Sequence, residues 1–268
     1  NYDDDFGREL LEILPKSLKV FVYTLIDETG DEGKEESDAL GRHVSIQGKI
    51  KKMDNNGLDM EVTSLLGEGH LSSRLLGRFN ASNLLAVLST LLMLDVPFDD
   101  ALDRLSKVST VPGRMERFGG ARGQPLVVVD FAHTPDALEQ VLQTLVEHCQ
   151  GELWCVFGCG GDRDKDKRAL MGAIAGQYAD HMVITDDNPR TEVATQIVSD
   201  ILSGIKDQGK LEVQRDRSQA IANAINQAAE GDVVLIAGKG HEEFQIIGDQ
   251  MVPFSDRSQV QSVLKDVA

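Results

Sequence analysis

From Leu126 onward, short apolar runs alternate with longer amphipathic segments. Five of these runs have the length and the β-branched content of buried strands: "LVVVDF", "LWCVFG", "HMVITD", "LEVQ" and "DVVLIAG". The intervening segments, such as "TPDALEQVLQTLVEH", space their apolar residues as helices do, with Thr134 as N-cap and Pro135 in the first turn. Regular alternation of strands and helices predicts a mostly parallel sheet with right-handed crossovers, which is a Rossmann-like α/β domain.

The end of the chain breaks this alternation. The segment "FQIIGDQMVPF", followed by a last helix, predicts a terminal hairpin or an antiparallel edge. The tetrapeptide "DRSQ" occurs at residues 216 and 256, near the starts of two predicted helices. Because the surrounding sequences do not repeat, we interpret it as helix-start chemistry that the two sites share.

The first part of the chain has a different pattern. The opening "NYDDDFGREL" leads into an amphipathic helix, and "KVFVYTLID" predicts a strand. The stretch "HVSIQGKIKKMDNNGLDMEVTSLLGEGHLSSRLL" predicts three antiparallel strands with turns at Asn-Gly and Gly-Glu-Gly. A buried apolar helix, "NASNLLAVLSTLLMLDV", and a second helix, "DDALDRLSKV", follow. Pro112 and Gly113 then interrupt the chain, so we place a boundary between domains 1–110 and 111–268.

Composition limits the classes of function. The chain has 268 residues, 41% of them apolar and 26% charged, as is normal for two soluble globular domains. A formal net charge of −17 argues against non-specific binding to nucleic acid or to an anionic membrane. No stretch has the length of a membrane span, and three cysteines without metal-ligand spacing favour a reducing compartment. We therefore expect a cytoplasmic protein without a nucleic-acid or membrane partner; separately from composition, we expect a monomer that acts on small molecules.

Polar clusters follow four of the predicted strands: "DFAHTPD", "GCGGDRDKDKR", "TDDNPRT" and "AGKGHEE". Because parallel strands end at one edge of a sheet, we expect these clusters to converge there. They carry His133, Arg163, Arg190, Lys239 and His241, together with several acidic residues. Each cluster alone has a plainer explanation: a glycine turn, a capped turn, or a histidine that satisfies a buried carbonyl. The convergence, rather than any single motif, indicates a ligand site.

Several other chemistries are disfavoured. "GCGGDRD" matches neither the dinucleotide fingerprint GxGxxG nor the phosphate loop GxxxxGK[ST]. A dehydrogenase would need that fingerprint after the first strand, where "VVVDFAHTPD" has no such glycines. No motif of a Ser-His-Asp triad or of a zinc site occurs, and we assign no metal ligand. The remaining candidates are interpreted as structural or surface residues: His43, His70, His148, His181, Cys155 and Cys159.

Taken together, six motifs in order resemble the ATP-dependent Mur ligase family: "GRFNASN", "VPGRMERF", "VVVDFAHTPDALE", "WCVFGCGGDRDKDKR", "ITDDNPRTE" and "VVLIAGKGHEEFQ". Within the family the resemblance is closest to members that add meso-diaminopimelate to UDP-N-acetylmuramoyl-L-alanyl-D-glutamate in peptidoglycan synthesis. It implies a UDP-sugar domain, a central ATPase domain and a Rossmann-like C-terminal domain that brings in the amino acid. The phosphate loop and the magnesium ligands of the central domain do not occur in the sequence. We therefore expect residues 1–110 to be the tail of the central domain, 111–268 the complete C-terminal domain, and the chain alone to be inactive.

The resemblance also implies roles for individual residues. Those implied to contact ATP, which is used with Mg²⁺, are Asn80, Asn83, Arg114, Asp130 and His133. Arg114 would be catalytic, because a fixed cation stabilises the charge that develops on a transferred phosphate. Those implied to bind meso-diaminopimelate are Arg163, Asp187, Asn188, Pro189, Arg190, Gly238 and Glu242.

Arg190 distinguishes between the possible amino-acid substrates within the family. Meso-diaminopimelate differs from lysine by a second carboxylate, and an arginine fork binds a carboxylate through two parallel hydrogen bonds. The resemblance therefore favours the diaminopimelate branch over a lysine-adding ligase, and "DNPR" with "GKGHE" argues against a folylpolyglutamate synthetase. A non-catalytic fragment that binds an amino acid or a nucleotide remains an alternative.

Overall fold

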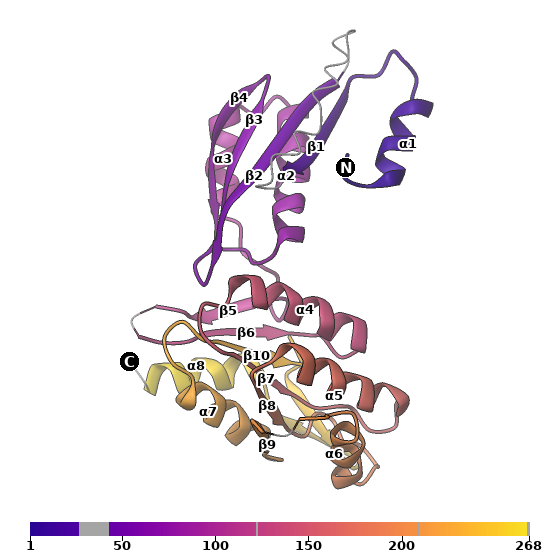
Figure 1. The fold of residues 1–268 in the computed structure, drawn as a ribbon, viewed down its shortest axis with the longest axis vertical. Helices are drawn as coiled ribbons and strands as arrows, with labels where there is room; N and C mark the ends of the chain where they lie inside the picture. The colour runs from indigo at the N-terminus through magenta and orange to yellow at the C-terminus, as the bar shows by residue number, and fades with distance from the viewer. Residues whose placement is uncertain (27–42, 122, 208, 267–268) are drawn as a thin grey trace. The chain divides into compact units, whose positions relative to one another are not determined.

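The computed structural model of the protein describes residues 1–26, 43–121, 123–207 and 209–266. Contacts divide the chain into two compact units, Asn1–Ser109 and Thr110–Ala268, and both are drawn in Figure 1. Among the described residues, no helix is both long enough and apolar enough to span a bilayer.

A mixed four-stranded sheet forms the centre of the first unit, in the order β1-β2-β3-β4. Its strands are β1 (Val20–Ile26), β2 (His43–Asp54), β3 (Gly57–Ser64) and β4 (Gly67–Ser73). β1 pairs in parallel with β2, whereas β2, β3 and β4 form the antiparallel meander that the sequence predicts. Side chains along β2 alternate between buried and half-buried, so the sheet has one core face.

The two hairpin turns of the meander have different outcomes. The turn predicted at "DNNG" is confirmed, since Asn55 and Asn56 connect β2 to β3. The turn predicted at Gly-Glu-Gly is wrong, because the chain reverses at Leu65–Leu66 and Gly67 already pairs with Ser64. These glycines serve packing instead: a Cβ on Gly67 would lie 2.7 Å from the Phe98 ring of the neighbouring helix.

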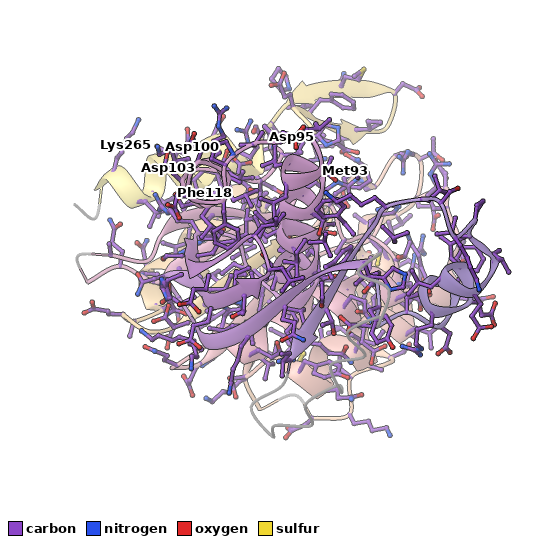
Figure 2. All side chains as sticks on the ribbon, turned by 90° about the horizontal axis from the view of Figure 1, so that it is seen from above. Met93, Asp95, Asp100, Asp103, Phe118 and Lys265 are labelled. Carbon is purple, nitrogen blue, oxygen red and sulfur yellow. The ribbon has the colours of Figure 1, made fainter. Side chains whose placement is uncertain are left out.

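The helices of this unit are α1 (Asp5–Ile13), α2 (Arg78–Met93) and α3 (Phe98–Ser106). α2 and α3 pack on the sheet and supply much of its core, including Leu84, Leu85, Leu88 and Leu102. The prediction of a buried apolar helix holds for only one face of α2, because Met93 is 55% exposed. Figure 2 labels Met93 at the end of α2, together with acidic residues of the following turn and of α3.

The second unit contains the predicted Rossmann-like sheet, in the order β5-β6-β10-β7-β8-β9. Its strands are β5 (Glu116–Gly119), β6 (Leu126–Asp130), β7 (Leu153–Phe157), β8 (His181–Ile184), β9 (Leu211–Val213) and β10 (Val233–Ala237). β6 to β10 are parallel, which confirms the mostly parallel α/β fold, whereas β5 is an antiparallel edge strand that the sequence analysis did not predict. β6, β7 and β10 are buried along their whole length, as expected for strands covered on both faces.

Helices cover both faces of this sheet (Figure 1). They are α4 (Pro135–His148), α5 (Asp166–Tyr178), α6 (Ala194–Leu202), α7 (Arg217–Gln227) and α8 (Asp256–Asp266). α4, α5 and α6 pack in sequence on one another, and α7 packs against α8. The predicted cap of α4 is confirmed, because Thr134 accepts a hydrogen bond from Ala137 N. The predicted terminal hairpin is also present, as β11 (Phe244–Ile247) and β12 (Gln250–Pro253).

The two "DRSQ" segments both lie at helix starts. Asp216 is the N-cap of α7 and accepts a hydrogen bond from Gln219 N, whereas Asp256 begins α8. The two copies also contact each other, because the Arg217 guanidinium donates to both oxygens of Asp256, at 2.7 and 2.8 Å. Both side chains of this pair are fully buried.

Candidate functional site

Four loops follow the carboxyl ends of neighbouring strands in the second unit, namely β6, β10, β7 and β8. Backbone hydrogen bonds join them in pairs. Gly238 N donates to Asp130 O at 3.1 Å, and Gly161 N donates to Asn188 O at 2.9 Å. The loops that carry Arg163 and Arg190 are therefore direct neighbours, and the "GKGHE" loop begins beside the end of β6.

Asn188, Lys239 and Glu242 form a closed hydrogen-bonded group. Lys239 Nζ donates to Asn188 Oδ1 at 3.0 Å and to Glu242 Oε2 at 2.8 Å. Asn188 Oδ1 also accepts from Ile246 N at 3.0 Å, and its Nδ2 donates to Glu242 Oε2 at 3.1 Å. Because two donors hold Oδ1, the orientation of the Asn188 amide is fixed. Glu242 Oε1 is left for a donor from outside the group.

Burial and neighbouring charges shift the pKa values of Glu242 and of the adjacent Asp187 in opposite directions. Burial raises the pKa of Asp187, against the opposing effect of Arg217 and Lys239. Asp187 Oδ1 lies 3.6 Å from Lys239 Nζ and has no hydrogen-bond partner within the described part of the chain. Burial also acts to raise the pKa of Glu242, but hydrogen bonds from Lys239 and Asn188 outweigh it and the pKa is lowered. The same buried cation, Lys239, thus lies beside two carboxylates whose pKa values shift in opposite directions.

Arg190 is held by its backbone and by one guanidinium nitrogen. Its backbone has a positive φ of 51° and bonds to the terminal hairpin, through Arg190 N to Ile246 O at 3.1 Å and Gly248 N to Arg190 O at 2.9 Å. Its Nη1 donates to Gly161 O at 2.8 Å. Within the described ranges, its other side-chain nitrogens have no protein partner. The half-buried fork is thus oriented and still able to bind an anion.

The other residues expected to bind the amino acid have less specific surroundings. Arg163 is exposed on the loop after β7, where no other described residue pairs with its guanidinium. Pro189 is buried, and its carbonyl oxygen lies so close to Gly161 that a Cβ added to Gly161 would be only 1.9 Å from it. Gly238 has a φ of 117°, and a Cβ there would lie 3.0 Å from Asp187 Oδ2. Gly161 and Gly238 therefore permit the loops to pack closely, against Pro189 and Asp187 respectively.

On the β6 side, the residues expected near ATP are partly engaged by the protein. Both oxygens of Asp130 accept backbone N–H groups, Oδ1 from Ala132 at 2.7 Å and Oδ2 from Met115 at 2.8 Å. His133 Nδ1 contacts Phe131 O at 2.9 Å, which is the plainer role that the sequence allowed. Arg114 is exposed and lies over the Phe131 ring, with Cζ 4.7 Å from its centroid. Among the described residues, no carboxylate forms an ion pair with Arg114.

Asn80 and Asn83 lie in the first turns of α2, in the first unit. Asn80 Nδ2 donates to Leu76 O at 2.8 Å, and Asn83 Nδ2 donates to Asn80 Oδ1 at 3.4 Å. These bonds fix the start of the helix and orient the Asn80 amide.

Three buried cations around the site were not among the residues singled out from the sequence as binding residues. They are Arg168, Arg217 and Lys239, and each of these side chains is 0% exposed. Lys239 was noticed only as one of the charges near a strand end. The available signal was the number of acidic residues on the neighbouring loops, because a buried cation needs such partners.

Comparison with known proteins identifies the family. Residues 113–240 match the family described as Mur ligase, glutamate ligase domain. A solved UDP-N-acetylmuramoyl-L-alanyl-D-glutamate–2,6-diaminopimelate ligase is 34% identical over 91% of this chain, with a TM-score of 0.72. The chain belongs to the Mur ligase family. This Mur ligase chain covers 53% of that solved structure, so it spans about half of its length.

Two further relatives share the fold of this Mur ligase chain. The UDP-N-acetylmuramate–alanine ligase of Thermotoga maritima is 19% identical, with a TM-score of 0.53, and the match covers 84% of this chain and 47% of that one. The folylpolyglutamate synthase of Thermotoga maritima is 20% identical, with a TM-score of 0.56 and coverage of 74% and 45%. At these identities the likeness concerns architecture alone.

Proposed function

We propose that the protein is a cytoplasmic, ATP-dependent ligase of peptidoglycan synthesis that adds meso-diaminopimelate to UDP-N-acetylmuramoyl-L-alanyl-D-glutamate. In this reaction ATP phosphorylates the D-glutamate γ-carboxylate, and an amine of diaminopimelate displaces phosphate from the acyl phosphate. Residues 111–268 are the amino-acid-binding domain, and residues 1–110 are the tail of the ATP-binding domain. The 34% identity to a diaminopimelate ligase supports the choice of substrate.

The observation that carries the proposal is that Asn188, two residues before Arg190, donates a hydrogen bond to Glu242, which brings the loops of Arg190 and Glu242 together. Arg190 offers an oriented guanidinium, and Glu242 offers a charged carboxylate whose Oε2 is held by Lys239 and Asn188. The distal carbon of meso-diaminopimelate carries a carboxylate and an ammonium, which complement these two groups. Lysine carries only the ammonium, so it leaves the Arg190 fork without a partner. Arg163 would bind the carboxylate of the other end.

The residues present fit an ATP phosphate better than they fit a magnesium ion. Arg114 is an exposed cation above Phe131, and Gly113 (φ 69°) and Gly240 (φ 54°) pack their backbones closely beside it. Arg114 would bind the phosphate and stabilise charge during its transfer. The described residues contain no group of three or more His, Cys, Asp or Glu side chains that could hold a metal ion. Our proposal remains that ATP is used with Mg²⁺ and that most of the Mg²⁺ ligands are not among these residues.

The test is Arg190→Ala and Arg190→Lys in the intact protein, with kcat/KM measured for meso-diaminopimelate and for L-lysine. Removing one partner of a buried, hydrogen-bonded charge pair costs roughly 2–5 kcal/mol, so Arg190→Ala should lower kcat/KM for meso-diaminopimelate by about thirty- to several-thousand-fold. Arg190→Lys should recover only part of this loss, because it keeps the charge but not the fork. The KM for ATP should scarcely change.

The same assay decides against the alternatives. A wild-type protein that uses L-lysine as well as meso-diaminopimelate would favour a lysine-adding ligase. If Arg190→Ala leaves the preference for meso-diaminopimelate intact, Arg190 does not read the second carboxylate and the proposal fails.

A further inference from the structure

Arg168 on α5 is the centre of a polar network that contacts both the loop of Arg163 and the loop of Arg190. Its side chain is fully buried, and its Nη2 donates to Glu192 Oε1 at 2.9 Å and to Gly160 O at 3.3 Å. Its Nη1 donates to Glu192 Oε2 at 3.1 Å and to Asp200 Oδ2 at 2.8 Å. Gly160 belongs to the loop of Arg163, whereas Glu192 follows Arg190 by two residues. The Arg168 guanidinium thus contacts both the loop that carries Arg163 and the loop that carries Arg190.

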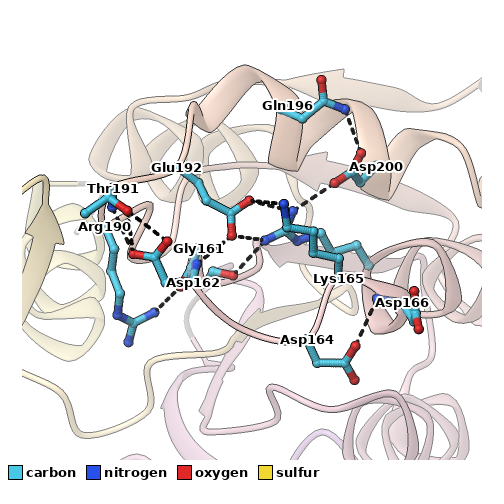
Figure 3. A network of polar contacts seen from close by, with 12 residues as sticks. Gly161, Asp162, Asp164, Lys165, Asp166, Arg190, Thr191, Glu192, Gln196 and Asp200 are labelled. Carbon is cyan, nitrogen blue, oxygen red and sulfur yellow. Dashed lines mark hydrogen bonds and ion pairs between the residues drawn. The ribbon is translucent and has the colours of Figure 1, made fainter.

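Glu192 and Asp162 connect the same two loops in opposite directions. Glu192 Oε1 accepts from Asp162 N at 2.6 Å, so a side chain of the Arg190 loop holds the backbone of the Arg163 loop. In return, the Asp162 carboxylate accepts from Thr191 N at 3.1 Å and from Thr191 Oγ1 at 2.9 Å. Figure 3 shows these contacts side by side with the bond from Arg190 to Gly161. The loops are therefore fastened to each other immediately beside both arginines.

The electrostatics of the network keep it intact over a wide pH range. Hydrogen bonds from Arg168, and then from Asp162 N, lower the pKa of Glu192 to about 2. A hydrogen bond from Arg168 likewise lowers the pKa of Asp200. Both carboxylates therefore stay anionic opposite a guanidinium that is shielded from water. Such charge-assisted bonds are the stronger kind and are directional.

We propose that Arg168, Glu192 and Asp162 are positioning residues that fix the separation of Arg163 and Arg190, and that this separation selects the length of a dicarboxylic diamino acid. The inference rests on the proposed function, in which the two arginines bind carboxylates at opposite ends of one substrate. The position of an arginine on a loop is only as well defined as the position of the loop. To discriminate substrates by length, two such loops must therefore be held at a fixed distance from each other. None of the three residues needs to touch the substrate.

Asp200 provides a matched control. It is a second carboxylate on the same Arg168 nitrogen, but it lies on α6 and its other side-chain bond is from Gln196 of the same helix, at 2.8 Å. Asp200→Asn therefore weakens Arg168 without removing a contact between the loops. Glu192→Gln makes the same chemical change at the residue that joins them. Thr191→Val, which removes one hydroxyl and no charge, is the milder second variant.

The first measurement is amide hydrogen exchange of the 268-residue chain, which requires no enzymatic activity. In Glu192→Gln, the N–H groups of Gly161, Asp162 and Thr191 should all exchange about tenfold faster or more, because losing a charge-assisted bond releases both loops. Thr191→Val should accelerate the same amides to a smaller extent. Asp200→Asn should leave them close to wild type. Unchanged exchange in both loop variants, or equal acceleration in Asp200→Asn, would overturn the proposal.

The second measurement is length discrimination by the intact protein. Glu192→Gln should raise KM for meso-diaminopimelate more than it lowers kcat, and should reduce the preference over 2,7-diaminosuberate, which is one methylene longer, by about tenfold. If Glu192→Gln accelerates amide exchange but leaves the preference for meso-diaminopimelate over 2,7-diaminosuberate unchanged, the positioning role is overturned. If the wild type does not use diaminopimelate at all, the proposed function fails, and the exchange result alone decides whether the network couples the loops.

Discussion

The pair Arg217–Asp256 allows a direct test of how burial sets the strength of an ion pair. The chain contains two copies of "DRSQ", and the arginine of each copy makes a two-pronged contact with a carboxylate. Arg217 binds Asp256 at 2.7 and 2.8 Å, with both side chains 0% exposed. Arg257 binds Glu116 at 2.6 and 2.9 Å, with side chains 30% and 17% exposed. The contacts are alike and the burial differs.

We expect Arg217→Met to destabilise the second unit far more than Arg257→Met. Breaking a buried pair leaves an uncompensated charge and costs roughly 3–5 kcal/mol, whereas a pair open to water contributes about 0.2–1 kcal/mol. Arg217→Met also removes the donor to Ala237 O, a bond of 2.9 Å at the end of β10. With a urea dependence of about 2 kcal/mol per molar, the midpoint should fall by about 1.5–2.5 M for Arg217→Met. For Arg257→Met the fall should be below about 0.5 M.

The assay is equilibrium urea unfolding followed by tryptophan fluorescence. Trp154 is the single tryptophan of the sequence, and it lies in β7 of the same unit as both pairs, 6% exposed and stacked on His181 at 3.7 Å. Its signal therefore reports the unfolding of the second unit. A double variant, Arg217→Met with Asp256→Leu, should recover much of the loss, because apolar replacement of both partners removes the unpaired charge. Equal midpoint shifts in the two single variants would refute the reasoning from burial, as would a double variant no more stable than Arg217→Met.

Two further predictions concern titratable groups of the second unit. Burial raises the pKa of both Cys155 and Cys159 to about 12. Iodoacetamide at pH 8 should therefore label neither cysteine in the folded protein and both in urea. Rapid labelling of either cysteine in the absence of urea would contradict this. Hydrogen bonds from Lys210 and His181 lower the pKa of Glu152 to about 2, below its ordinary value of 4.5. The stability from Glu152 is therefore complete above pH 4.5 and is lost as the pH falls towards 2. Lys210→Met should lower the thermal midpoint at pH 7, and the difference from wild type should disappear between about pH 4.5 and pH 2. A difference that persists at pH 2 would show that the lost stability does not come from the interaction with Glu152.

Much of the fold follows from local sequence. The apolar runs that became β6, β7 and β10 are continuous because these strands are covered on both faces, and helices with recognisable caps separate them. The same pattern places polar loops after parallel strands, and it therefore predicts that Arg163, Arg190 and Glu242 lie at one edge of the sheet. Local sequence failed where packing overrode turn chemistry, as at Gly67, whose lack of a side chain serves the approach of Phe98.

Only the tertiary structure decided which charged side chains lose contact with water. Arg217 and Arg257 occupy the same tetrapeptide, yet one is fully buried and the other is partly exposed. Lys239 bonds to Asn188, which is 51 residues away in the sequence, and Arg217 bonds to Asp256, which is 39 residues away. Propensity, capping and periodicity act over a few residues, so they determine strands, helices and loop positions. The desolvation of a charge depends on partners brought together by the insertion of β10 between β6 and β7, which no local pattern encodes.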